Sequence, residues 1–143
     1  MNEPVKLHFP VDGQDFTSAG QASVQVKKSL RQLGISPDII RKVSIAMYEG
    51  EINMVIHADG GVADVIVWED KIRVILADKG PGIPDVALAM QEGYSTAKDN
   101  IRSLGFGAGM GLPNMKRYSD SINIDTVVGE GTTVTMDFEI PKK

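Results

Sequence analysis

The chain has 143 residues, with 42% hydrophobic and 24% charged side chains, which predicts a single globular domain over residues 1–143. It has no cysteine, and this excludes disulfides, thiolate metal sites and a cysteine nucleophile. The net charge of −4, the lack of a basic and apolar leader and the lack of a long apolar run predict a cytoplasmic protein that binds neither nucleic acid nor membrane.

The first half of the chain predicts one strand, two helices and a hairpin. The strands show alternating or continuous apolar residues, and the helices show apolar residues at helical spacing. The expected elements are a strand over 5–9 that ends at Pro10, helices over 17–33 and 36–56, and strands over 62–68 and 72–77. Lys27, Lys28 and Arg31 on the first helix are typical of a solvated face.

The second half opens with a Gly/Pro-rich loop over 78–84. The elements expected after it are a short helix over 84–91, a long loop over 93–108, a helix over 109–118, and strands over 121–127 and 132–140. This order predicts an α+β fold, with a layer of helices on a mainly antiparallel sheet.

Three polar residues, Glu49, Asn53 and His57, are spaced by four on the second long helix and therefore share one stripe. Glu51 lies about 200° around the helix from Glu49, so only Glu49 joins this stripe. Asn53 offers an oxygen ligand for Mg²⁺, and Glu49 could accept a proton. Taken alone, an exposed polar stripe is the simpler interpretation, and His57 is more typical of a capping residue.

Two glycine-rich segments follow. Asp78 ends an apolar strand just before Gly80 and Gly82, where a ligand could approach the backbone and an amine could donate to the carboxylate; a plain turn is the alternative. The second segment runs from Gly105 to Gly111, with glycine at every second position ahead of a helix, an arrangement that favours phosphate binding. A hinge without a ligand is its alternative.

The order of these features resembles the GHKL ATPases, a superfamily of gyrase, heat-shock chaperone, histidine kinase and mismatch-repair proteins. The resemblance implies the Bergerat fold, a two-layer sandwich of helices on a mainly antiparallel mixed sheet, with ATP and Mg²⁺ as cofactors. It implies Glu49 as the catalytic base, Asn53 as the metal ligand, and adenine recognition by Asp78 and Thr132. The cofactor-binding residues expected on this basis are Asn53, Asp78, Gly80, Gly82, Gly105, Gly107, Ala108, Gly109, Met110, Gly111 and Thr132.

Within the superfamily, the chain is most similar to the small bacterial serine kinases of partner-switching systems, which include anti-sigma factors and RsbT-type stressosome kinases. The similar segments are 78–85, 92–96, 109–117 and 129–132. The resemblance implies transfer of the γ-phosphoryl group to a serine or threonine of a STAS-domain partner. Related kinases often dimerise, so a homodimer is an open alternative.

Two features depart from that subgroup. Residues 97–104 form a longer segment than expected, and Gly50 follows the expected base at a cost of about 1 kcal/mol relative to alanine in a helix. A non-catalytic module that sequesters a sigma factor or another partner, and a slow ATPase subunit of a larger assembly, both stay open. Glu49 favours catalysis among these alternatives.

Overall fold

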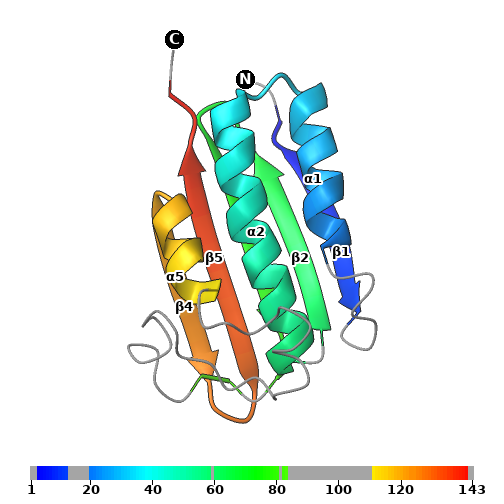
Figure 1. Cartoon of the computed structure of the whole chain (residues 1–143), viewed down its shortest axis with the longest axis vertical. Helices are drawn as coiled ribbons and strands as arrows, with labels where there is room; N and C mark the ends of the chain where they lie inside the picture. Colours follow the sequence, from blue (N-terminus) through cyan, green and yellow to red (C-terminus); the bar gives the residue numbers. More distant parts are fainter. Residues whose placement is uncertain (1–2, 13–19, 59, 81, 84–110, 142–143) are drawn as a thin grey trace.

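The computed structural model describes residues 3–12, 20–58, 60–80, 82–83 and 111–141. Within these ranges, three helices cover one face of a five-stranded sheet (Figure 1). The elements are β1 (Val5–Asp12), α1 (Gln21–Gln32), α2 (Pro37–Ala58), β2 (Gly60–Val67), β3 (Lys71–Asp78), α5 (Gly111–Tyr118), β4 (Ser121–Val127) and β5 (Gly131–Glu139). The predicted two-layer α+β fold is confirmed.

The strands lie in the order β1-β2-β3-β5-β4, and the four pairs among the described residues are antiparallel. Because β5 lies between β3 and β4, the last hairpin brings its turn beside the end of β3. Asp78 of β3 is opposite Thr132 of β5, which is opposite Thr126 of β4. Three polar side chains thus share one row across the sheet.

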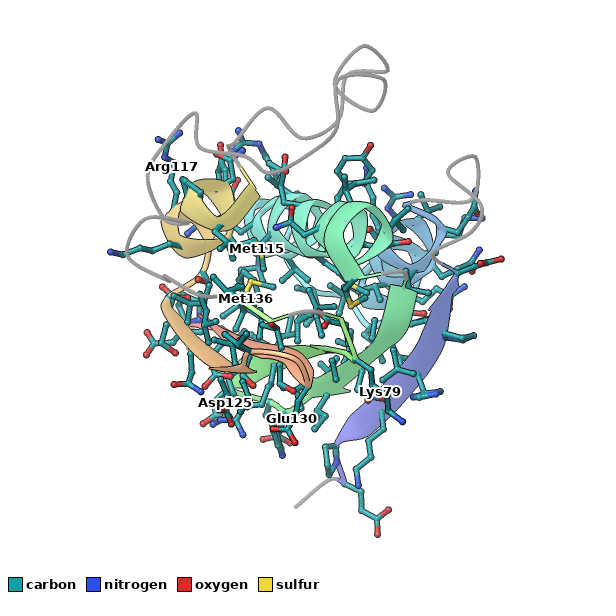
Figure 2. The ribbon with its side chains drawn as sticks, turned by 90° about the horizontal axis from the view of Figure 1, so that it is seen from below. Lys79, Met115, Arg117, Asp125, Glu130 and Met136 are labelled. Atoms are coloured by element: carbon teal, nitrogen blue, oxygen red, sulfur yellow. The ribbon has the colours of Figure 1, made fainter. Side chains whose placement is uncertain are left out.

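The core lies between the helices and the sheet. Alternate strand residues face the helices and are fully buried, as the period of two requires. Figure 2 shows Met115 of α5 and Met136 of β5 between the two layers. Other fully buried members are Val26, Leu30, Val43, Met47, Val65, Ile72, Val74 and Phe138. None of the described helices has the length and hydrophobicity that crossing a bilayer requires.

The expected element boundaries depart most from the structure at the end of the first strand and at the start of the first helix. The first strand does not end at Pro10 but continues to Asp12, with Pro10 opposite Val62. β1 is an edge strand, and an edge tolerates a residue without an N–H group. The first helix begins at Gln21 rather than Thr17, because Gly20 adopts a left-handed conformation with φ of 96°. The expected helix over 84–91 and loop over 93–108 lie outside the described residues.

Candidate functional site

Helix α2 crosses the middle of the helical layer (Figure 1) and carries Glu49 and Asn53 of the expected polar stripe. Gly50 allows this helix to lie close to the sheet. A Cβ at this position would come within 2.1 Å of Leu76 Cδ1 and 3.1 Å of Met115 Cε. The glycine that weakens the helix therefore lets α2 pack directly against β3 and α5.

Glu51 has a structural role at the start of α1. Its carboxylate is buried, and it accepts hydrogen bonds from the backbone N–H groups of Gly20 at 2.8 Å, Ala22 at 3.2 Å and Ser23 at 3.0 Å. The Ser23 hydroxyl donates a fourth bond at 2.6 Å. Free N–H groups at a helix start need acceptors, so a residue of α2 supplies the cap that Gly20 cannot.

Glu49 points to the other side of α2. Its side chain is half-buried and lies beside α5, where Asn114 Nδ2 donates to Glu49 Oε1 at 3.5 Å. The two neighbouring carboxylates therefore diverge as the helical rotation predicts. Glu49 thus places a half-buried carboxylate on the α5 side of α2.

Asn53 lies one turn further along α2 and touches the first residue of α5. A Cβ on Gly111 would lie 2.7 Å from Asn53 Nδ2 and 2.8 Å from Asn53 Oδ1. Asn53 Nδ2 also contacts Met115 Sδ at 4.0 Å. Since the N-terminal end of a helix carries partial positive charge, the Asn53 amide lies beside the positive end of α5.

Asp78 ends β3 and organises the loop that follows. Its Oδ1 accepts hydrogen bonds from Gly80 N at 2.9 Å and from Thr132 N at 3.1 Å. Gly80 in turn packs against α2, because a Cβ there would lie 2.6 Å from Ala58 Cβ. The carboxylate is thereby held between the end of β3, the start of β5 and the end of α2.

Thr132 is buried at 7% exposure and continues this network to β4. Its hydroxyl lies 2.9 Å from Thr126 Oγ1, which also accepts a 2.9 Å bond from Ile83 N. Gly82 has φ of 79°, and a Cβ on it would come within 2.7 Å of Val127 O. The first glycine segment is therefore fastened to the β4–β5 hairpin.

The described residues thus form two clusters along the second half of α2. The first cluster consists of Glu49 and Asn53 of α2 and of Gly111 of α5, which lies against Asn53. The second consists of Asp78, Gly80, Gly82 and Thr132, and it contacts α2 where Gly80 meets Ala58. The remaining expected site residues lie outside the described part: Gly105, Gly107, Ala108, Gly109 and Met110, and the side chain of His57.

Sequence reasoning missed Asn114 and Thr126. Asn114 lies three residues after Gly111, where the helical period would have placed it over α2. Thr126 follows Ile122 and Ile124 on the helix-facing side of β4, so a hydroxyl stands where the alternation predicts an apolar side chain. That break in the pattern was the available signal.

Residues 14–138 match the family model of the histidine kinase-like ATPase domain. The chain belongs to this family. The match covers all the described site residues, from Glu49 on α2 to Thr132 on β5. This ATPase domain is also similar to relatives of about its own length.

One such relative is the serine/threonine-protein kinase RsbT of Bacillus subtilis, 31% identical over 84% of this chain and 85% of its own. Another is the anti-sigma F factor of Clostridium beijerinckii, 32% identical over 80% of this chain and 81% of its own. Among solved structures, the RsbU and RsbW domains of a Mycobacterium tuberculosis protein match with a TM-score of 0.65 at 17% identity. This match covers 97% of the ATPase domain and 33% of that chain, and it supports the fold alone.

Proposed function

We propose that this ATPase domain is a cytoplasmic serine/threonine protein kinase of a bacterial partner-switching system, which phosphorylates a STAS-like partner. One observation carries the proposal. α2 holds Glu49 and Asn53 one turn apart, and the glycine that opens α5 lies against Asn53. A proton acceptor, a metal ligand and a phosphate-binding helix start are thus adjacent, as phosphoryl transfer requires. The kinase and anti-sigma names of the relatives support this proposal.

The described residues fit Mg-ATP in their donor chemistry. Asn53 offers one neutral oxygen, which suits Mg²⁺ because this ion completes its shell with phosphates and water. A Cβ on Gly111 would strike the Asn53 amide, so glycine at this position leaves the amide in its place beside α5. Asp78 uses Oδ1 for both of its described protein bonds, which fits a role for the other carboxylate oxygen in binding an amine.

Glu49 is the proposed base. Bound Mg-ATP supplies the phosphoryl group and the cation that offsets its charge. The partner's hydroxyl oxygen forms the new bond to the γ-phosphorus, the bond to ADP breaks, and the hydroxyl proton passes to Glu49. Asn114, which donates to Glu49 Oε1, holds the carboxylate on the α5 side of α2.

The test begins with the partner. Wild-type protein with Mg-ATP is used to retain interacting proteins from the native cytoplasm, and phosphosites are mapped on what is retained. We expect a phosphoserine or phosphothreonine on a STAS-domain protein. A partner that stays unphosphorylated while the chain binds ATP would contradict the kinase proposal.

A substitution then assigns the base. Glu49→Gln should bind ATP as the wild type does and lose phosphoryl transfer by at least about a hundredfold, the usual contribution of a general base. Asp38→Asn, which changes an exposed carboxylate at the start of the same helix, is the control and should keep full transfer.

The anti-sigma names of several relatives favour a second candidate, a module that sequesters a sigma factor without phosphorylating it. The same variant separates the two. If Glu49→Gln regulates the partner as well as the wild type does, binding alone is sufficient. If regulation is lost with phosphoryl transfer, the kinase proposal is supported.

A further inference from the structure

Thr126 of β4 connects three parts of the cluster around Asp78. Its Oγ1 accepts from Ile83 N at 2.9 Å, lies 3.2 Å from Gly131 O and lies 2.9 Å from Thr132 Oγ1. Ile83 belongs to the first glycine segment, and the other two residues begin β5. One hydroxyl therefore joins the loop after β3 to the strand that faces Asp78.

One arrangement of the hydroxyl protons makes all three contacts of Thr126 Oγ1 hydrogen bonds. A carbonyl oxygen can only accept, so the one Thr126 hydroxyl hydrogen must point to Gly131 O for that contact to be a hydrogen bond. Thr126 then has only lone pairs for Thr132, and the Thr132 hydroxyl must be the donor. The Thr132 hydrogen is thereby committed to Thr126, and the remaining lone pairs of Thr132 Oγ1 can only accept.

The second polar group of the cluster is also an acceptor. The Asp78 carboxylate receives the N–H groups of Gly80 and Thr132 and has no hydrogen to donate when ionised. Asp78 and Thr132 therefore present two acceptors side by side. An exocyclic amino group carries two hydrogens and matches this pair, whereas a carbonyl oxygen would place lone pairs against lone pairs.

We propose that Thr126 is a positioning residue that makes the nucleotide site selective for a 6-amino purine over a 6-oxo purine, by holding the Thr132 hydroxyl as an acceptor. This inference rests on the nucleotide site of the proposed function but not on phosphoryl transfer. Thr126 does this through Thr132 and Ile83, without contact to the base.

The surrounding backbone makes the arrangement rigid. Gly131 has φ of 137°, and a Cβ on it would come within 2.2 Å of Asp78 O. Gly82, in the loop after β3, packs so closely against β4 that a Cβ on it would come within 2.7 Å of Val127 O. Because the backbones pack this tightly, the Thr126 hydroxyl cannot be replaced by a small shift of its neighbours, and its loss leaves Ile83 N–H without this acceptor.

Dissociation constants for Mg-ATP and Mg-ITP test the proposal, since inosine replaces the 6-amino group of adenine with an oxygen. Wild type should prefer ATP. Thr126→Val keeps the volume and removes the hydroxyl, and it should lower the ATP-to-ITP preference about tenfold, mainly by weakening ATP. Thr126→Ser keeps the hydroxyl and should retain the wild-type preference for ATP. Thr133→Val, on the opposite face of β5, should leave it unchanged.

A wild type without preference, a Thr126→Val variant with wild-type preference, or a Thr126→Ser variant as impaired as Thr126→Val would each overturn the inference. If circular dichroism shows that Thr126→Val is unfolded, Thr126→Ala, which also lacks the hydroxyl, carries the same expectation. Failure of phosphoryl transfer with intact ATP preference would contradict the kinase proposal and leave this inference standing.

Discussion

Glu49 and Glu51 lie two residues apart on α2 and point to different sides of this helix. Glu51 accepts hydrogen bonds at the start of α1, and Glu49 accepts one from Asn114 of α5. Two steps of about 100° turn the second carboxylate away from the first. The buried carboxylate has its acceptor capacity filled by three N–H groups and a hydroxyl. The half-buried one remains accessible. Of these two carboxylates, only that of Glu49 is left for the role of base that we propose.

The first prediction concerns the stability that Glu51 supplies. Glu51→Ala leaves the buried N–H groups of Gly20, Ala22 and Ser23 without their acceptor, so the free energy of unfolding should fall by about 3 kcal/mol. Glu49→Ala is the control and should change it by less than about 0.5 kcal/mol. Urea denaturation measures both. An equal loss in the two variants would show that the buried cap is not the cause.

Gly50→Ala should be destabilising, against the intrinsic preference of helices. Alanine gains about 1 kcal/mol of helix propensity, but its Cβ would lie 2.1 Å from Leu76 Cδ1. Such overpacking costs about 1–3 kcal/mol, so a net loss is expected. Thermal unfolding measures it. Leu76→Val removes the nearest atom, and the double variant should be more stable than the sum of the two single changes; additivity would contradict the proposed clash.

Ser44→Ala on α2 should stabilise the protein. Ser44 Oγ is buried and has no hydrogen-bond partner among the described residues. Removing it relieves a desolvation cost and adds helix propensity, which together should raise the free energy of unfolding by about 1 kcal/mol. Ser29→Ala, at a half-buried position of α1, is the control, expected to show the propensity gain alone. A loss of stability in Ser44→Ala would reveal a partner for the hydroxyl.

Much of the fold could be predicted from sequence because its signals are local. The alternation in β3 and β5 and the helical period of α2 each specify an element, and the hairpins follow from the turns between them. The end of the first strand at Pro10 and the start of the first helix before Gly20 were mispredicted because both depend on distant parts of the chain. Whether a proline ends a strand, or a glycine lies before a helix, depends on edge position and on a cap supplied by Glu51, which is 31 residues away from Gly20.

The site was only partly predictable. Motif spacing predicted Glu49, Asn53, Asp78 and Thr132 as site residues, because each belongs to a short pattern, and the structure places them in two clusters along α2. Thr126 has no pattern of its own, and its importance arises from a register that brings it opposite Thr132. Sequence alone does not contain that register.

The ion pair on the open face of the sheet predicts a pH dependence. Arg73 donates to Asp137 at 2.7 and 3.0 Å, and this hydrogen bond lowers the pKa of the Asp137 carboxyl below its usual value. A folded-state pKa below the unfolded one gives stability that is present above the unfolded pKa and is lost as the pH falls through the folded pKa.

A double-mutant cycle of Arg73→Met and Asp137→Asn measures this pair. Both side chains are partly exposed, so we expect a coupling of about 0.5–1 kcal/mol near neutral pH. The coupling should shrink at acid pH, below the ordinary aspartate value of about 3.9, as Asp137 becomes protonated. Urea denaturation at both pH values provides the data. A coupling that is constant across this range would contradict the electrostatic origin.

The contact between Gly111 and Asn53 predicts how the site responds to one added methyl group. Gly111→Ala would place a carbon 2.7 Å from Asn53 Nδ2 and 2.8 Å from Oδ1, so the amide or the start of α5 must shift. If Asn53 holds the metal, ATP affinity should fall about tenfold with Mg²⁺ present and little in EDTA. Dissociation constants under both conditions measure this.

Asn53→Ala supplies the control for that prediction. It removes the atoms that the new methyl group would strike, so in its background Gly111→Ala should cause no further loss of Mg-dependent affinity. If Gly111→Ala instead weakens ATP equally with and without Mg²⁺, or weakens it again in the Asn53→Ala background, the glycine acts on the phosphates directly. The two results therefore separate a glycine that accommodates the metal ligand from one that only exposes the backbone N–H groups of α5.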